Sequence, residues 1–350
     1  METTAKRDIR KLKLDELKEF FIQHGDKPFR AQQVYEWLWK KSAKEFDQMT
    51  NLSLPTRELL KAHFTINFIK VDHMQRSTDG TIKNAVTLHD GLVVESVLIP
   101  AEKRITACVS SQVGCSLDCK FCATAKLKRM RNLNADEIYD QVVAIKQQSE
   151  LFFGRPLTNI VFMGMGEPLL NYNNVIAAID KITSPQGLNM ASKRLTVSTV
   201  GIAKMIMKMA HDGVKFNLAV SLHSALNHVR SSIMPINDSN SLEELAEALK
   251  YWYNKTKRKV TYEYVVWKNI NDTEEHAQAL LKFGKIVPCK VNLIEYNPIG
   301  DSEFQQASTE ALNMYMDLLE RHGITTRVRK SRGKDIDAAC GQLANKAEAR

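Results

Sequence analysis

From about residue 104 onward, the chain repeats one pattern: a short apolar run, a polar loop and a longer segment with helical spacing. Such alternation favours a parallel sheet with helices packed outside it. The sequence therefore predicts an α/β fold, a partial (β/α)6 barrel. The expected strands are 105–109, 159–163, 195–198, 216–222, 260–266 and 291–296. The expected helices are 135–147, 175–182, 203–211, 242–253, 275–283 and 309–321.

Two smaller units precede this series. Residues 1–65 show helical spacing at 14–21 and 31–39, which predicts a small helical accessory domain, suited to docking RNA. Three extended segments follow within 66–100, separated by Thr-Asp-Gly and His-Asp-Gly turn signals, and they predict an antiparallel β extension. We expect the barrel over 101–343 and a short tail over 344–350.

The cysteines are bunched in a way that indicates metal binding. Three of the six, Cys115, Cys119 and Cys122, form a CxxxCxxC motif. Three thiolates at this spacing can bind three irons of a 4Fe–4S cluster and leave the fourth iron open. Structural zinc normally takes four Cys or His ligands, usually as two pairs, and no second pair follows here. Zinc stays open as a less favoured alternative.

The net charge of +9 and the sequence pI of about 9.1 favour a polyanionic partner. Each of three segments, 120–131, 250–259 and 327–334, contains five basic residues and no acidic residue. Solvated helix and loop faces are the alternative interpretation of each. No apolar run reaches the roughly 18 residues of a membrane span, and the N-terminus lacks a secretory pattern. We therefore expect a cytoplasmic protein that does not bind membranes.

The cysteine motif, with an aromatic residue before its last cysteine and a strand before the loop, resembles the radical S-adenosylmethionine (radical SAM) superfamily. Further motifs resemble the branch that methylates adenine in ribosomal and transfer RNA, and the match covers about 95–343 in order. These motifs are CVSSQVGC (108–115), FMGMGEPL (162–169), TVSTVG (196–201), SLH (221–223), MPIN (234–237), YNP (296–298) and DIDAACG (335–341).

The resemblance implies one 4Fe–4S cluster on Cys115, Cys119 and Cys122, and two S-adenosylmethionine molecules per turnover. It also implies a set of residues that contact the cofactor at the ends of the strands. These residues are Gly166, Glu167, Ser198, Ser221, Leu222, His223 and Asn297. Ordinary strand-end turns and caps are the alternative for them.

The branch also implies a reaction. Carbon 2 of adenine is electron-poor and cannot attack an electrophilic methyl group, so radical chemistry is needed. By resemblance, Cys340 carries the methyl group, Cys108 frees the product through a transient disulfide, and Glu95 removes the adenine proton. The implied substrates are adenine-2503 of 23S rRNA, in the peptidyl transferase centre, and adenine-37 of tRNA. The implied partner is a low-potential electron donor such as flavodoxin or ferredoxin, and a monomer is expected.

Several alternatives stay open at this point. Cys108 lies in an apolar strand and can pack as a small hydrophobic residue, as we expect Cys289 to do. Glu95 interrupts an apolar run and either faces solvent or is buried for a purpose. A sister family methylates carbon 8 of the same rRNA adenine with the same cysteines. A zinc-stabilised RNA-binding protein without catalysis is the alternative from another class.

Overall fold

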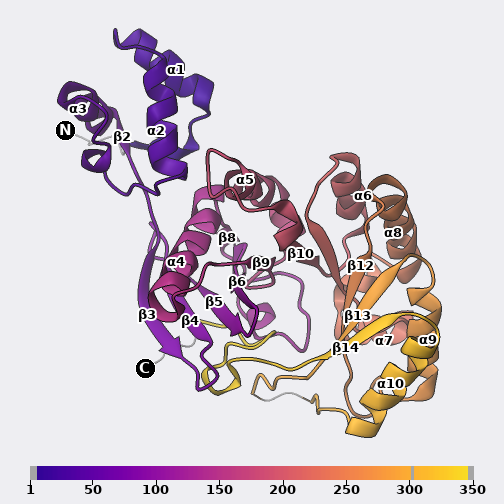
Figure 1. The fold of residues 1–350 in the computed structure, drawn as a ribbon. Helices are drawn as coiled ribbons and strands as arrows, with labels where there is room; N and C mark the ends of the chain where they lie inside the picture. Colours follow the sequence, from indigo (N-terminus) through magenta and orange to yellow (C-terminus); the bar gives the residue numbers. More distant parts are fainter. Residues whose placement is uncertain (1–5, 301–302, 346–350) are drawn as a thin grey trace.

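A single ten-stranded sheet organises the computed structural model, which describes residues 6–300 and 303–345. Seven neighbouring strands are parallel and follow the order of the chain. They are β6 (Arg104–Cys108), β9 (Asn159–Phe162), β10 (Leu195–Thr199), β11 (Asn217–Ser221), β12 (Val260–Val265), β13 (Cys289–Ile294) and β14 (Thr325–Arg329). The strands curve into an open barrel (Figure 1). The predicted fold class is confirmed.

Helices connect each parallel strand to the next and cover the outside of the sheet (Figure 1). They are α4 (Ala135–Phe153), α5 (Tyr172–Thr183), α6 (Ala203–His211), α7 (Asn227–Ile233), α8 (Leu242–Thr256), α9 (Glu274–Gly284) and α10 (Thr309–Arg321). Both α7 and α8 lie in the connection from β11 to β12. Six β/α units therefore precede the final strand.

The seventh parallel strand, β14, was missed by the sequence analysis. It pairs with β13 and overlaps the segment 327–334, whose sequence indicates only a cluster of basic residues. Its β-branched residues Thr325, Thr326 and Val328 suit a strand, but they alternate with arginines. Because the arginines occupy every second position, the segment carries no apolar run that would reveal a strand.

An antiparallel extension continues the same sheet, as the turn signals predicted. It consists of β3 (Lys70–Arg76), β4 (Ile82–Thr87) and β5 (Val93–Ala101), and β5 pairs antiparallel with β6. The two turns each contain a glycine in the left-handed region, Gly80 with φ +84° and Gly91 with φ +81°. A residue with a side chain is strained there, which explains the glycines.

The N-terminal residues form a separate helical module, at the upper left of Figure 1. It contains α1 (Leu14–Gln23), α2 (Phe29–Trp39) and α3 (Leu54–His63), and the short parallel pair β1 (Arg7–Asp8) and β2 (Phe64–Thr65). Arg10 fixes the module to α4, because its guanidinium bonds Asp140 at 2.8 Å and Asp136 at 3.3 Å in a buried site. Trp39, which is buried, packs edge-on against Tyr139 of α4.

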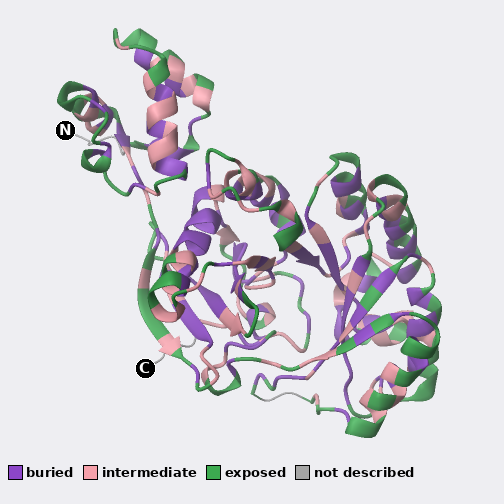
Figure 2. Cartoon of the chain, in the orientation of Figure 1, coloured by how far each residue is buried: buried purple, intermediate pink, exposed green. Residues whose placement is uncertain are grey.

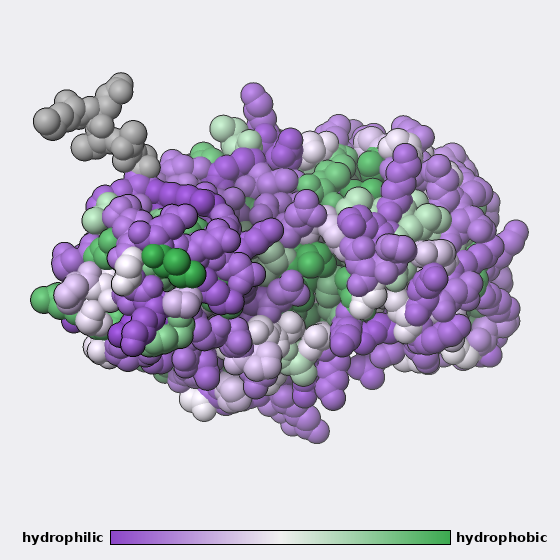
Figure 3. All heavy atoms as spheres, turned by 90° about the horizontal axis from the view of Figure 1, so that it is seen from above, coloured by the Kyte–Doolittle hydropathy of each residue, from purple (hydrophilic) through white to green (hydrophobic). Residues whose placement is uncertain are grey.

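Burial follows this layout. Buried residues run along the inner strands and the inward faces of the helices, and exposed residues cover the outside (Figure 2). Seen from above, the surface is largely hydrophilic, and apolar side chains show in patches (Figure 3). Within residues 6–300 and 303–345, no helix is both long and apolar enough to cross a membrane.

Candidate active site in the barrel lumen

A cavity of about 730 Å³ occupies the inside of the open barrel. Strand side chains alternate between the two faces of a sheet, so every second residue points into it. The alternation appears as Thr106 and Cys108 on β6, Thr196 and Ser198 on β10, Thr261 and Glu263 on β12, and Arg327 and Arg329 on β14. The intervening residues, such as Val197, Tyr262 and Tyr264, are buried among the outer helices. The strands therefore contribute polar side chains to the lumen, whereas the space behind the strands is apolar.

The cysteine motif lies on one wall of this cavity. The loop between β7 (Gln112–Val113) and β8 (Arg131–Asn132) carries Cys115, Cys119 and Cys122, and all three line the cavity. Gly114 begins the loop with φ +75°, and a Cβ there would lie 2.3 Å from the carbonyl oxygen of Lys128. Only glycine therefore allows the loop to return so close to its own start.

The cysteine wall is largely apolar. Leu117, Ile233, Met234 and Trp267 form a second buried cluster around Cys119, separate from the main core. Burial raises the pKa of each of the three thiols, and their neighbouring thiolates raise the pKa of Cys115 and Cys119 further. Three thiolates on one buried wall need compensating positive charge, which the irons of a cluster would supply.

The residues present fit a cluster held by three thiolates. The motif supplies three cysteines on one loop, and the other three cysteines lie on other segments. In the part of the chain that the structure describes, no three His, Cys, Asp or Glu side chains are arranged to hold a single metal ion. Three thiols around one cavity wall match the donor set of a 4Fe–4S cluster with one open iron.

Gly166 and Glu167 follow β9 and line the cavity beside the cysteines. Gly166 has φ +89°, and a Cβ there would lie 2.4 Å from the Cβ of Gln112. The Glu167 carboxylate accepts backbone N–H bonds from Leu169 at 3.0 Å and Val200 at 2.9 Å. Burial nevertheless raises the pKa of Glu167 to about 7. A cationic amino group of the cofactor would stabilise the carboxylate and lower that pKa.

His223 offers a neutral hydrogen-bond donor to the cavity. Burial, and then the charge of Arg230, lowers the pKa of His223 to about 3. Its Nδ1 accepts the backbone N–H of Val265 at 3.1 Å, so the proton of the neutral ring resides on Nε2. Phe121 and Trp267 pack against the ring, with centroids 4.7 Å and 5.7 Å away.

The other expected cofactor contacts divide into two groups. Ser198, Ser221 and Asn297 line the cavity, whereas Leu222 is buried in the main core and does not. Asn297 donates from Nδ2 to the Cys340 carbonyl at 3.3 Å, while its buried Oδ1 has no hydrogen-bond partner among the described residues. An unsatisfied buried acceptor costs about 1–3 kcal/mol, which a donor on a bound ligand would recover.

Cys108 and Cys340 come from distant parts of the chain and line the same cavity. Cys108 ends β6 and is buried, whereas Cys340 lies in the C-terminal segment and is exposed. Burial raises the pKa of Cys108 to about 12, and the Cys340 thiolate contributes to that rise. The fold therefore brings together the two cysteines that the resemblance paired.

Glu95 is buried, with an exposed fraction of 1%, so the solvent-facing alternative is wrong. Its Oε1 pairs with Lys83 Nζ at 3.3 Å, and its Oε2 accepts the backbone N–H of Ala344 at 2.8 Å. Glu95 is not among the residues that line the cavity. The C-terminal segment after Cys340 therefore bonds directly to the Glu95 carboxylate, which the family resemblance implies is the catalytic base.

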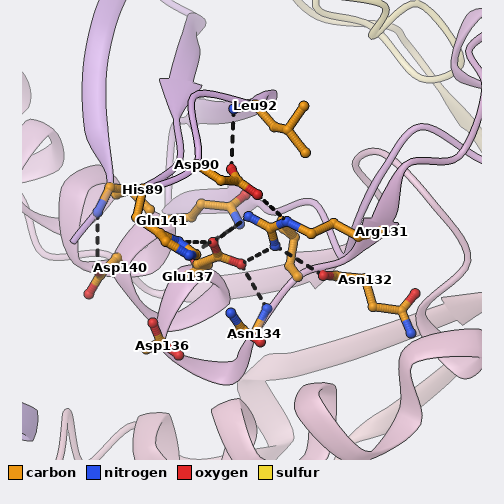
Figure 4. Close-up of polar contacts among 12 residues, drawn as sticks. His89, Asp90, Leu92, Arg131, Asn132, Asn134, Asp136, Glu137, Asp140 and Gln141 are labelled. Atoms are coloured by element: carbon orange, nitrogen blue, oxygen red, sulfur yellow. Dashed lines mark hydrogen bonds and ion pairs between the residues drawn. The ribbon is translucent and has the colours of Figure 1, made fainter. Parts of the chain in front are cut away.

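Arg131 anchors the end of the cysteine loop (Figure 4). Its guanidinium makes two 2.7 Å bonds to the Glu137 carboxylate, and its Nε bonds Asp90 at 2.6 Å. Glu137 lies in the first turn of α4, and its Oε2 also accepts the Asn134 backbone N–H at 2.8 Å. The loop is thereby tied to both α4 and the turn between β4 and β5.

Three charged residues that the sequence analysis did not single out complete the site. Arg329 of β14 lies 3.6 Å from Glu263 of β12 on the lumen side of the sheet, and the Cys340 thiolate is the largest cause of the raised pKa of Arg329. Arg230 is fully buried and donates to the carbonyls of Leu222, Ser221 and Val200, which follow or end β11 and β10. Each lies within an apolar or basic stretch, so no local pattern marks it.

Comparison with known proteins identifies the family. Residues 7–66 match the ribosomal RNA large subunit methyltransferase N-terminal domain, and residues 109–281 match the radical SAM superfamily. The chain is 69% identical to a probable dual-specificity RNA methyltransferase RlmN of Christiangramia forsetii, over 97% of both chains. It is 41% identical to a Streptococcus agalactiae protein of the same name, over 97% of this chain and 93% of that protein.

A solved structure agrees with these relatives. The crystal structure of a radical SAM methyltransferase from Sphaerobacter thermophilus is similar, with a TM-score of 0.90 and 38% sequence identity. The alignment covers 96% of this chain and 99% of that one. The chain therefore belongs to the RlmN family of radical SAM RNA methyltransferases.

Proposed function

We propose that the protein methylates carbon 2 of adenine in RNA, through a methyl group carried on Cys340. The observation that carries the proposal is that Cys108, Cys340 and the three motif cysteines line one cavity. A methyltransferase that moved the methyl group directly from cofactor to substrate would need neither of the two additional thiols. The family match favours carbon 2 over carbon 8, and it does not favour the zinc-stabilised RNA-binding alternative.

When bound, the cluster and S-adenosylmethionine supply the electron, the methyl group and the 5′-deoxyadenosyl radical. The Cys340 thiolate takes the methyl group by displacement. The methyl group on Cys340 loses one hydrogen to the 5′-deoxyadenosyl radical, and the methylene radical that remains adds to adenine carbon 2. The adduct loses its carbon 2 proton to Glu95 and one electron, which the bound cluster would accept. The Cys108 thiolate then attacks the Cys340 sulfur, so that an S–S bond forms as the S–C bond to the RNA breaks. The released carbon keeps the bonding electron pair and takes a proton, which completes the new methyl group on adenine.

The geometry supports the following chemical tasks for the residues around the thiols. Glu167 binds the amino group of the cofactor, while Ser198, Ser221, His223 and the free Asn297 Oδ1 complete its polar surroundings. Gly166 lets the backbone approach closely, and Leu222 acts through its backbone, since its side chain faces the core. Glu95 must lose its bond from Ala344 before it can reach a substrate, so the C-terminal segment has to shift during turnover.

The cationic rim of the lumen supports an RNA substrate. Arg104, Arg327, Lys330 and Arg332 line the same cavity, where they can neutralise phosphates near the target base. We assign the helical module over 1–65 to RNA docking, the extension over 66–100 to its support, and the barrel over 101–343 to catalysis. The tail over 344–350 lies mostly outside the described residues.

The dual specificity in the relatives' name supports two RNA classes, 23S rRNA and tRNA. We further propose that the protein acts as a cytoplasmic monomer and takes single electrons from a low-potential donor such as flavodoxin or ferredoxin.

The test is product analysis after anaerobic turnover. Reconstituted protein is incubated with 23S rRNA or tRNA, S-adenosylmethionine and dithionite, and the RNA is digested for mass spectrometry with chromatographic standards. We expect 2-methyladenosine from the wild type and none from Cys340→Ala. Formation of 8-methyladenosine instead, or normal methylation by Cys340→Ala, would contradict the proposal.

A further inference from the structure

The cysteine loop has a second face that the proposed chemistry does not use. Its inner face lines the cavity, whereas Lys120, Lys126, Lys128 and Arg129 are exposed and do not line it. Met130 is beside them in the chain, with an exposed fraction of 58%. We call these five residues the cluster-loop patch.

The patch carries free positive charge. None of its four cations has an ion-pair partner among the described residues, and Asp118 is the only acid between Cys115 and Met130. Arg131, the next cation along the chain, differs because Asp90 and Glu137 clamp it (Figure 4). Arg131, the fifth basic residue of the segment 120–131, therefore has a structural role, and the other four basic residues are available to a partner.

The patch is held in a fixed position relative to the motif cysteines. Met130 N–H donates to the Val113 carbonyl at 2.9 Å, and Cys115 N–H donates to the Leu127 carbonyl at 3.4 Å. Lys120 stands between Cys119 and Cys122 in the chain, and its own N–H donates to the Ile233 carbonyl at 3.1 Å. A partner on this patch would therefore dock within a few residues of all three thiolates.

A separate set of cations already serves the substrate side. Arg104, Arg327, Arg329, Lys330 and Arg332 line the cavity that must admit the adenine. The patch cations do not line it, so they are poorly placed to hold phosphates around a base that reaches Cys340. The chain thus has two sets of cations, one that lines the cavity and one on the outside of the loop that carries the cysteines.

We propose that the cluster-loop patch docks a small acidic protein that carries single electrons at low potential. The inference rests on the proposed function, because it presumes a cluster that must be reduced. In the docked complex, the carrier loses one electron and the cluster gains it. Charge complementarity speeds such encounters, and redox partners form small, weak interfaces. Four unpaired exposed cations and an exposed methionine on one loop suit such an interface.

The experiment compares two triple charge reversals of the full-length, cluster-loaded protein. The test variant is Lys120→Glu, Lys126→Glu and Lys128→Glu. The matched control is Lys215→Glu, Lys282→Glu and Lys285→Glu, which changes the net charge equally at exposed lysines outside the cavity and outside the three basic segments. Iron content and thermal unfolding show whether each variant is intact. If the test variant loses iron, Lys126→Gln with Lys128→Gln replaces it.

Three quantities are measured at about 50 mM salt: the affinity for oxidised flavodoxin, the rate of cluster reduction by reduced flavodoxin, and the affinity for RNA. We expect the test variant to bind flavodoxin at least about tenfold more weakly. Its cluster should be reduced correspondingly more slowly, because complementary surface charges raise both the association rate and the affinity. Its RNA affinity should stay within about twofold of the control variant. Methylation driven by dithionite should be normal.

Unchanged flavodoxin binding and reduction in the test variant would overturn the inference. A loss of RNA affinity with flavodoxin binding intact would overturn it too, and would assign the patch to RNA. Failure of the proposed function is a distinct result, since wild-type protein would then fail to methylate RNA even with dithionite, while the flavodoxin affinities could still be compared.

Discussion

The two walls of the lumen differ in character. The cysteine-loop wall is packed with apolar side chains around Cys119 and is held by backbone bonds. The strand wall carries Cys108 among charged groups, chiefly Arg329 and Glu263. Cys340 lies where the two walls meet, because Ala123 N–H of the cysteine loop donates to the Gly341 carbonyl at 2.7 Å. A dry wall protects radical generation from water, and on the strand wall the Arg329 charge opposes the rise that burial gives to the pKa of Cys108. One cavity therefore separates two kinds of sulfur chemistry by environment rather than by distance along the chain.

The largest effect should come from removing the apolar wall's thiols. Replacing Cys115, Cys119 and Cys122 with alanine should abolish binding of about four irons and reduce methylation below detection, because no other described residues can hold the cluster. Iron and sulfide analysis of anaerobically purified protein measures this. Cys289→Ala is the control, since Cys289 packs on β13 outside the cavity. Full iron content in the triple variant would break the comparison.

A smaller effect should come from neutralising the charged wall. Arg329→Met should slow transfer of the first methyl group to Cys340 by about 30–160-fold, because the Arg329 charge interacts with the Cys340 thiolate and a charge-assisted interaction contributes roughly 2–3 kcal/mol. Arg329→Lys should recover part of the rate. Mass spectrometry of the Cys340 peptide after incubation with S-adenosylmethionine measures methylation, with iron content as the control. Loss of iron together with methylation would mean that the two walls are not independent.

The smallest effect concerns Glu167, which lies where the walls meet. Burial raises the pKa of its carboxyl to about 7 in the folded protein from the ordinary 4.5. Folding thus favours the protonated form, so this group's contribution is most favourable below pH 4.5 and is lost as pH rises through 7. Between pH 5 and 8 the wild type should lose about 2 kcal/mol of stability that Glu167→Gln does not lose.

Chemical denaturation of the cofactor-free protein, at pH 5, 6, 7 and 8, measures the difference between wild type and Glu167→Gln. Using the difference cancels the other buried acids, such as Asp136, whose pKa burial also raises. Parallel stability curves for the two proteins would show that Glu167 does not titrate in this range. They would also remove the reason for a cationic partner at this position.

The sequence revealed the repetitive part of the fold. The six strands and their helices carry apolar periodicity, and the turn signals marked the extension, so these elements could be predicted. Strand β14 could not, because its side chains that face the lumen are arginines. A strand that borders a polar cavity lacks the apolar alternation on which prediction depends.

The site divides in the same way. The motif residues could be predicted because they cluster in short segments, and all but Glu95 and Leu222 line the cavity. The sequence does not predict Glu263, Arg329 and Arg230 as site residues. Glu263 and Arg329 pair with each other from different strands, and Arg230 donates to backbone carbonyls, which no side-chain pattern marks. Such residues become visible only when the strands are aligned and the lumen has a definite face.

The central claim is that Cys340 and Cys108 cooperate within the lumen, and the most direct test is the fate of RNA in Cys108→Ala. With cluster, cofactor and reductant present, radical addition can proceed but release cannot. The account predicts that this variant accumulates a covalent complex between Cys340 and RNA, seen on a denaturing gel as a nuclease-sensitive band of raised mass. Cys108→Ala with Cys340→Ala should form no such band. Normal turnover by Cys108→Ala, without an adduct, would contradict the account.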